Sequence, residues 1–315
     1  MDHQTLVERF APLILAKAEK EWPAADCITG VDYAGTIADA ADNPDTLMAA
    51  PWNKLVDAAK IYYSICETTT HWFLIYAAYH PLDWYRRGKA DNLYDLIRDK
   101  LDEHVHDMEG TLVVVSKEFP LKAEGLFTIF HNDFYLYRHP RGKYLGKFFE
   151  DCDGEMRFDA NMNKRPKLYV QARGHGIKGD KKGWGGGYMI IYYRPDFEDA
   201  TPDDEDVPEV TKHLTYRLED IHAPDGLWAH RHDPRVFLQR EDGRWAFSCR
   251  KKENARRLTA GSANPPWSWY DHNDPSYAGE IATDPASFIL RYVNGWGPVS
   301  RQYVFNPYLE IDRSV

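Results

Sequence analysis

The sequence predicts a mainly β protein with peripheral helices, an α+β chain whose core is a β-sandwich. Aromatic residues make up 14% of its 315 residues, and such side chains favour broad sheet surfaces. Six short segments are rich in aromatic and β-branched residues and are bounded by turn formers, which is typical of strands. These candidate strands are His71–Tyr79, Gly110–Val115, Gly125–Phe130, Pro166–Gln171, Tyr188–Arg194 and Arg244–Ser248.

A helix is expected at the start of the chain, over residues 1–22. Leu6, Phe10 and Leu13 recur at close to helical spacing, and Pro23 ends the pattern. Helical spacing of apolar residues predicts two further helices, one within Pro44–Tyr63 and an inserted surface helix at Asp91–Glu103.

An acidic stretch, residues 195–209, separates the fifth candidate strand from the sixth. It contains eight Asp or Glu residues and three prolines, so it cannot bury an apolar face and is expected to form a loop. Because candidate strands occur on both sides of it, we expect an insertion within one domain that spans residues 1–315, rather than a linker between two domains.

Composition excludes several classes of partner. The chain has 39 Lys and Arg against 49 Asp and Glu, a net charge of −10. Nucleic-acid binding depends on neutralising phosphates with basic side chains, so no nucleic-acid partner is expected. No apolar run approaches the ~20 residues that cross a bilayer, so no membrane span is expected. The oligomeric state is not predicted by the sequence.

The cysteines and the amino terminus favour a cytoplasmic location. Four cysteines lie far apart without a CxxC pair, which is typical of reduced thiols rather than of a disulfide framework. Residues 1–19 lack the basic region and cleavage site of a signal peptide. Secretion without a visible signal peptide remains the alternative.

The densest cluster of ligand-type side chains is Glu103–Glu109, directly before a candidate strand. His104 offers an imidazole nitrogen, and Asp107 and Glu109 offer carboxylate oxygens that project to one side of an extended chain. This mixed set predicts a divalent cation, with Mg²⁺ or Ca²⁺ expected first and Mn²⁺, Zn²⁺ or Fe²⁺ as alternatives. The competing interpretation is that a helix ends here and that its polar residues are solvated.

Two other stretches are weaker candidates for chemistry. His230-Arg231-His232-Asp233 repeats the form His-x-His-Asp but has no acidic residue two places on, and a solvated loop is favoured there. A glycine-rich stretch follows Arg173, yet Asp180 stands where a phosphate-binding loop requires Lys.

Two histidines could act as an acid or base. His175 sits between two glycines shortly after a candidate strand, where backbone freedom lets an imidazole enter a cleft. His106 lies within the acidic cluster and is not assigned as a ligand. A turn histidine without a role is the alternative for His175.

A third cluster gathers aromatic rings beside polar groups near the end of the chain. Trp267, Trp269 and Asp271 belong to it, and a sugar or choline headgroup could stack there. A packed lid is the alternative.

Taken in order, several motifs resemble known families. Phe10–Ile14 followed by Trp22-Pro23, and Pro266–Asp271 near the end, resemble the opening and closing motifs of the vacuolar protein sorting-associated protein 62 family. Three further segments are similar both to that family and to the necrosis-inducing NLP-type proteins. They are Tyr79–Asp83, His104–Glu109 with its His-x-His-Asp-x-Glu motif, and Ala172–Gly176.

The resemblance implies a β-sandwich dressed with helices and a divalent cation. The NLP-type signature is Gly-His-Arg-His-Asp-Trp-Glu, and His104, Asp107 and Glu109 match its ligands. Asp83 looks like the acidic residue that completes that site. Glu103, Val105 and Met108 depart from the signature, because they replace its Gly, Arg and Trp. In that family the cation serves a pocket that recognises sphingolipid sugar headgroups.

Two functions follow as expectations. The first is a binding protein in which the cation, Trp267 and Trp269 hold a small molecule, a glycan or a lipid headgroup. The second is a metal-dependent enzyme of the hydrolase or lyase type, in which His106 or His175 moves a proton.

Overall fold

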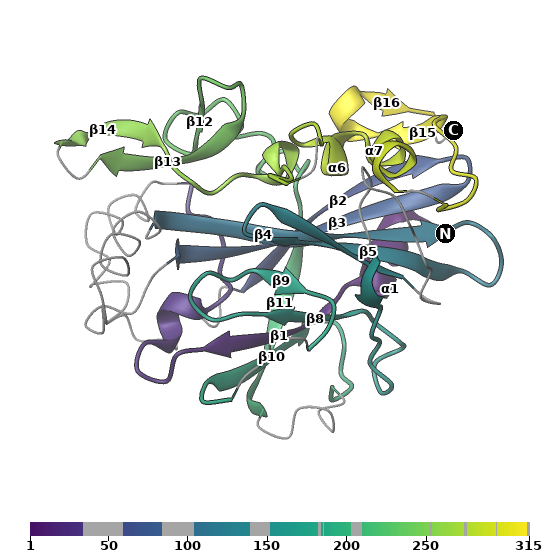
Figure 1. Ribbon diagram of the computed structural model, residues 1–315, viewed down its shortest axis with the longest axis horizontal. Helices are drawn as coiled ribbons and strands as arrows, with labels where there is room; N and C mark the ends of the chain where they lie inside the picture. Colours follow the sequence, from purple (N-terminus) through teal and green to yellow (C-terminus); the bar gives the residue numbers. More distant parts are fainter. Residues whose placement is uncertain are drawn as a thin grey trace.

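The computed structural model describes residues 1–33, 59–83, 104–138, 152–181, 184, 186–202, 210–251, 254–273, 276–293 and 295–313. Strands dominate these residues, and the helices are few and short (Figure 1), so the expected mainly β class is confirmed. The large sheet contains β1 (Leu13–Ala18), β2 (Lys60–Thr68), β3 (His71–Asp83), β4 (His104–Ser116), β5 (Lys122–Phe130), β6 (Asp133–Arg138), β7 (Cys152–Glu155), β8 (Lys167–Val170), β9 (Ile177–Lys178), β10 (Met189–Pro195), β11 (Val210–Asp220), β15 (Tyr303–Asn306) and β16 (Ile311–Asp312). The small sheet contains β12 (Phe237–Gln239), β13 (Trp245–Lys251) and β14 (Asn254–Ala260).

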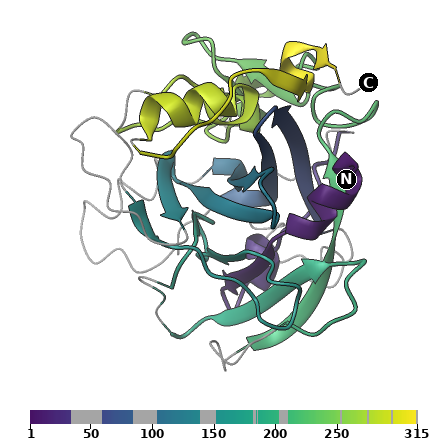
Figure 2. The same cartoon turned by 90° about the vertical axis from the view of Figure 1, so that its right-hand side faces the viewer.

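The large sheet is one hydrogen-bonded surface that curls back on itself. Its strand order is β7-β6-β5-β4-β3-β2-β11-β10-β1-β8-β9, with β15 added beside β2. Near the far end of this path β9 comes back against β5 and β4, and Figure 2 shows the curl from the side. A core of two separate stacked sheets is therefore not confirmed, because a continuous ladder joins the two layers.

The long central strands bury both faces. Along β3, Phe73, Ile75, Ala77 and Tyr79 belong to one core, and Leu74, Tyr76 and Ala78 belong to the other. This alternation follows from the period of two in an extended chain. The first core lies on the outer face, beneath the small sheet, α6 (Glu280–Thr283) and α7 (Pro285–Tyr292), whereas the second fills the inside of the curl with α1 (His3–Phe10).

The helix expected over residues 1–22 is wrong beyond Phe10. Asp2 caps α1 by accepting a hydrogen bond from the Thr5 backbone N–H at 2.8 Å. Pro12 then disfavours the helical conformation of the residue before it. The apolar run that follows forms β1, whose six residues are all buried between β8 and β10, and such a run can be taken for either element.

The other expected elements have mixed outcomes. All six candidate strands are confirmed, as β3, β4, β5, β8, β10 and β13. The expected helices at 44–63 and 91–103 lie outside the described residues, except that β2 begins at Lys60. Of the acidic stretch, Pro195 is the last residue of β10, residues 196–202 belong to no helix or strand, and residues 203–209 lie outside the described residues.

Two short helical turns complete the frame of the site. η1 (Pro23–Asp26) lies against β1 and β3, and η2 (Pro266–Ser268) lies against α6 and β13. No helix among the described residues is long and apolar enough to cross a membrane. All four cysteines are free.

Candidate functional site

The predicted acidic pair lies near the start of β4. Asp107 and Glu109 are each only 5% exposed, so the interpretation as a solvated helix end is wrong. The β3–β4 register sets His80 opposite Asp107 and Ala78 opposite Glu109. Because side chains alternate along a strand, both carboxylates project to the same face.

Glu109 has an incomplete set of partners. Its Oε1 accepts a hydrogen bond from the His131 backbone N–H at 3.1 Å, whereas its Oε2 is buried and has no hydrogen-bond partner among the described residues. Burial raises the pKa of Glu109 well above its usual range, and the charges of Asp107 and Asp83 raise it further. A buried carboxylate in this position needs either a proton or a cation.

His175 lies fully buried between two carboxylates. Its Nδ1 is 3.1 Å from Asp107 Oδ2, and its Nε2 is 3.2 Å from Asp26 Oδ1. Both partners are carboxylates, an arrangement that favours an imidazolium whose two ring nitrogens both donate. Burial acts to lower its pKa, but the hydrogen bonds and charges of Asp107 and Asp26 outweigh burial and raise the pKa to about 10.

This position corrects the expectation for His175, because it is neither a solvated turn residue nor exposed at a cleft. The loop after β8 turns inward through left-handed φ values of 75° at Arg173 and 49° at His175. Gly174 lets the loop approach the turn between β5 and β6, since a Cβ there would overlap the His131 ring and lie 2.9 Å from its Nε2.

Two residues of this cluster were missed by sequence reasoning. Asp26 is fully buried in η1 and accepts hydrogen bonds from the backbone N–H groups of Glu19 and Arg173, both at 2.7 Å. His80 is also fully buried and stacks on His175, with ring centroids 3.8 Å apart and planes 5° apart. Its only signal in the sequence was its place beside Asp83, and Asp26 had none.

The remaining two predicted ligands, Asp83 and His104, lie three residues further along the ladder than the pair His80 and Asp107. Asp83 is opposite His104 in the β3–β4 register, and the side chain of His104 lies outside the description. The charges of Asp83 and Asp107 act on Glu109, whose buried Oε2 has no hydrogen-bond partner among the described residues. Carboxylate oxygens are the ligands that hard divalent cations prefer, but among the described residues Asp83, Asp107 and Glu109 are not a group whose ligand atoms all lie within 4.8 Å of one another.

His106, the other candidate acid or base, is buried and only 6% exposed. Its Nδ1 lies 2.7 Å from the Tyr79 hydroxyl, its Nε2 lies 3.0 Å from the Ser248 carbonyl oxygen, and its ring stacks on Phe247. Tyr79 and Phe247 belong to the outer core, on the side of β3 and β4 away from His80. His106 therefore fastens β4 to the small sheet.

The two tryptophans near the end of the chain are core residues, which corrects the expectation of a stacking platform. Trp267 and Trp269 are 7% and 2% exposed. Trp267 packs edge-on against Trp228, and the Trp269 indole N–H donates to the Met108 carbonyl oxygen at 3.0 Å. Neither ring offers an open face to a sugar.

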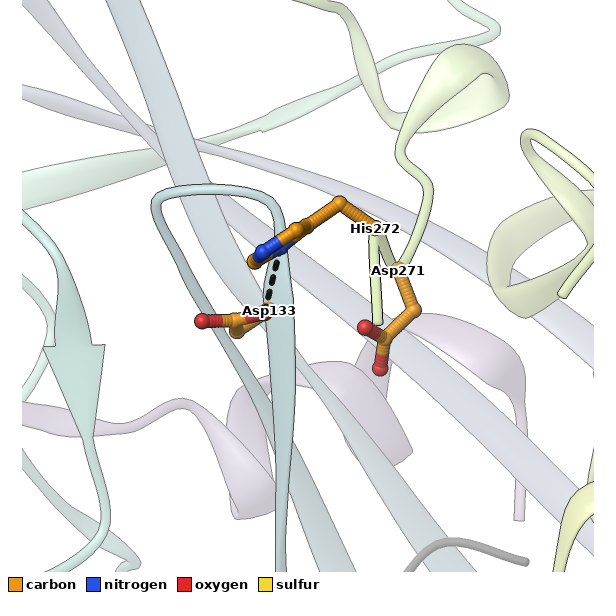
Figure 3. A group of neighbouring side chains, drawn as sticks. All are labelled: Asp133, Asp271 and His272. Carbon is orange, nitrogen blue, oxygen red and sulfur yellow. Dashed lines mark ion pairs between the residues drawn. The ribbon is translucent and has the colours of Figure 1, made fainter. Parts of the chain in front are cut away.

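Asp271 also has a structural role. Its carboxylate accepts hydrogen bonds from the Phe134 and Asn273 backbone N–H groups, at 3.1 and 3.3 Å. Together with Asp133 and His272 it forms a group whose ligand atoms lie within 4.8 Å of one another, and this group is not the predicted metal set (Figure 3). His272 is already paired with Asp133 at 2.6 Å, so the group fastens the segment after η2 to the start of β6.

The second histidine cluster is a surface turn. Asp233 accepts hydrogen bonds from Arg235, and the His230 ring stacks on Tyr33 with centroids 4.0 Å apart. The solvated loop favoured for this stretch agrees with these contacts.

Comparisons with known proteins give only remote likeness. No protein-family model matches the chain, and no curated protein matches it. Its structural neighbours include toxin-fold proteins of the necrosis- and ethylene-inducing type. A structure described as a toxin fold for microbial attack and plant defense is 12% identical, with a TM-score of 0.38, over 92% of this chain and 90% of that one.

Two further neighbours are of the same kind. Necrosis and Ethylene inducing Protein 2, from the causal agent of cocoa's Witches Broom disease, is 16% identical with a TM-score of 0.34, over 75% of this chain and 87% of its own. The non-toxic HaNLP3 protein is 14% identical with a TM-score of 0.32, over 60% and 73%. The resemblance to the vacuolar protein sorting-associated protein 62 family stays a prediction.

Proposed function

We propose that this chain is a binding protein that holds one divalent cation and uses it to bind a glycan or lipid headgroup. The cation ligands are Asp83, His104, Asp107 and Glu109. Glu109 carries the proposal, because its Oε2 is buried without a hydrogen-bond partner in the described part of the chain. The charges of Asp107 and Asp83 oppose the ionisation of the buried Glu109, and a divalent cation would remove that cost.

The donor atoms favour Mg²⁺ or Ca²⁺. Both cations prefer carboxylate oxygens and keep positions for water or for ligand oxygens. Sugar hydroxyl groups and phosphate oxygens can take those positions, which is how a cation near the start of β4 would hold a polar headgroup. This function needs neither a β-sandwich core nor a ligand that stacks on Trp267 and Trp269.

No observation favours the enzyme alternative. A general base needs a ring nitrogen that can reach a substrate proton. Both ring nitrogens of His106 and both of His175 are within hydrogen-bond distance of protein oxygens.

The first test measures cation binding by calorimetry after treatment with a chelator. We expect about one cation per chain for Ca²⁺ or Mg²⁺, together with a rise in melting temperature, because a ligand that binds only the native state stabilises it. Glu109→Gln keeps the shape but loses the charge, and should weaken binding at least about 10-fold, as a lost charged contact of ~1.4 kcal/mol implies.

The matched control is Asp233→Asn, in the second His-x-His-Asp stretch, which should bind the cation as the parent does. Absence of cation binding and of thermal stabilisation in the parent would sink the proposal. A loss confined to Asp233→Asn would move the site to the other cluster.

The ligand is tested next, with and without the cation. The NLPPya structures are described in complex with mannosamine and with glucosamine, so these two amino sugars are the soluble probes, beside vesicles that contain a glycosylated sphingolipid. Binding of a probe only when the cation is present supports the proposal, and equal binding in a chelator contradicts it.

A further inference from the structure

The cation site includes a part of the chain far from its ligands. Asp26 lies in η1, Asp107 in β4 and His175 in the loop after β8, and side-chain hydrogen bonds of His175 join these three segments. Each of the three residues is at most 5% exposed. We call this chain of hydrogen bonds the carboxylate bridge.

We infer that His175 and Asp26 are positioning residues of this site, which hold the Asp107 carboxylate in the orientation that binds the cation. This inference rests on the proposed function. His175 donates to Oδ2 of Asp107, and Asp26 fixes the far side of the imidazole. Asp26 is itself held by the backbone N–H groups of Glu19 and Arg173, so the bridge ends on a rigid anchor.

A cation site depends on such support, because partners of the ligands set the direction of their lone pairs. Loss of such a partner typically weakens metal affinity 10–100-fold. A purely structural role for His175 would instead lower the stability of the fold and leave the affinity of folded protein unchanged. The two roles are therefore separated by measuring affinity well below the melting temperature.

Two conservative variants separate the arms of the bridge. In His175→Asn the amide nitrogen takes the place of Nδ1, so a donor toward Asp107 remains. In His175→Gln the amide nitrogen takes the place of Nε2, so only a donor toward Asp26 remains. We expect His175→Gln to weaken Ca²⁺ or Mg²⁺ binding about 10–100-fold. The loss of affinity in His175→Asn should be about one tenth as large.

His80 supplies the matched control. It is as buried as His175 and stacks on it, but no hydrogen bond joins its ring to the carboxylate of Asp107 or of Asp26. His80→Gln should change the dissociation constant less than about 3-fold, because it removes packing and not the bridge. If His175→Gln does not fold, Asp26→Asn is measured instead. Asp26→Asn should weaken cation binding about 10-fold, although Asp107 itself is not substituted.

The outcomes are distinct. Parent-like affinity in folded His175→Gln, or in its replacement Asp26→Asn, overturns the inference. An equal loss in His175→Gln, His175→Asn and His80→Gln also overturns it, because packing alone would explain that pattern. A parent that binds no cation refutes the proposed function, and the positioning role falls with it.

Discussion

His106 shows how a residue can belong to a functional motif and still serve the fold. Its two ring nitrogens join the Tyr79 hydroxyl to the Ser248 carbonyl oxygen, across the gap between β4 and β13. We expect His106→Ala to lower the free energy of unfolding by about 2–4 kcal/mol, because it removes two buried hydrogen bonds and leaves a cavity. Urea unfolding measures this loss. Cation affinity of the folded variant should be unchanged, and a weakened affinity with parent-like stability would return His106 to the site.

At the scale of residues, the sequence predicts that Asp107 and Glu109 lie together, but it does not predict which residues surround them. The spacing of Asp107 and Glu109 sets them on one face of any extended chain, so their proximity follows from local geometry. The contact of His175 with Asp26 joins positions 149 residues apart. No local pattern encodes that distance, and the glycines beside His175 indicated freedom where the structure has close packing.

At the scale of elements, the packing of β4 against the segment after β14 depends on one close contact. Gly110 lies under the Trp269 ring, and a Cβ there would overlap this ring and lie 2.5 Å from the Tyr76 carbonyl oxygen. Gly110→Ala should therefore lower the free energy of unfolding by about 1–3 kcal/mol, the usual cost of overpacking. Thermal or urea unfolding measures the loss.

The control for this substitution is Gly186→Ala, because nothing lies within 4 Å of a Cβ at Gly186. It should change stability by no more than about 0.5 kcal/mol. Addition of Trp269→Phe to Gly110→Ala should recover only part of the loss, since the Tyr76 carbonyl oxygen stays in place. Equal effects of the two glycine substitutions would show that the Trp269 contact is not formed.

The strands with strong local signals were predictable, and those that depend on their neighbours were not. The six candidate strands combine β-branched and aromatic residues with turn formers at both ends. The sequence predicts a helix where β1 forms, because the residues of β1 are buried on both faces and lose the alternation that marks a half-exposed strand. Its identity is set by β8 and β10, which lie far along the chain.

At the scale of the molecule, the path of the sheet could not be predicted from the sequence. β2 joins β11 in parallel, and this pairing connects β10, β1, β8 and β9 with the other strands in one curled surface. A resemblance to sandwich proteins predicts the layers but not the strands that connect them. Register between distant strands depends on contacts that no window of sequence contains.

The stability of the whole molecule should depend on pH through Glu67. This residue on β2 accepts from His3 of α1 at 2.7 Å and from Lys117 in the loop between β4 and β5, so it ties three distant segments. Burial acts to raise its pKa, but the hydrogen bonds and charges of His3 and Lys117 outweigh burial and lower the pKa to about 2. An unfolded glutamate has a pKa of about 4.3, so above that pH the folded state gains from the charged carboxylate. This contribution is lost as the pH falls from about 5 to about 2.

Glu67→Gln should thus be less stable than the parent at pH 7, and the difference in urea unfolding should shrink by pH 3. The exposed Glu241→Gln serves as the control. A difference that stays constant between pH 7 and pH 3 would mean that Glu67 does not hold these segments together through its charge.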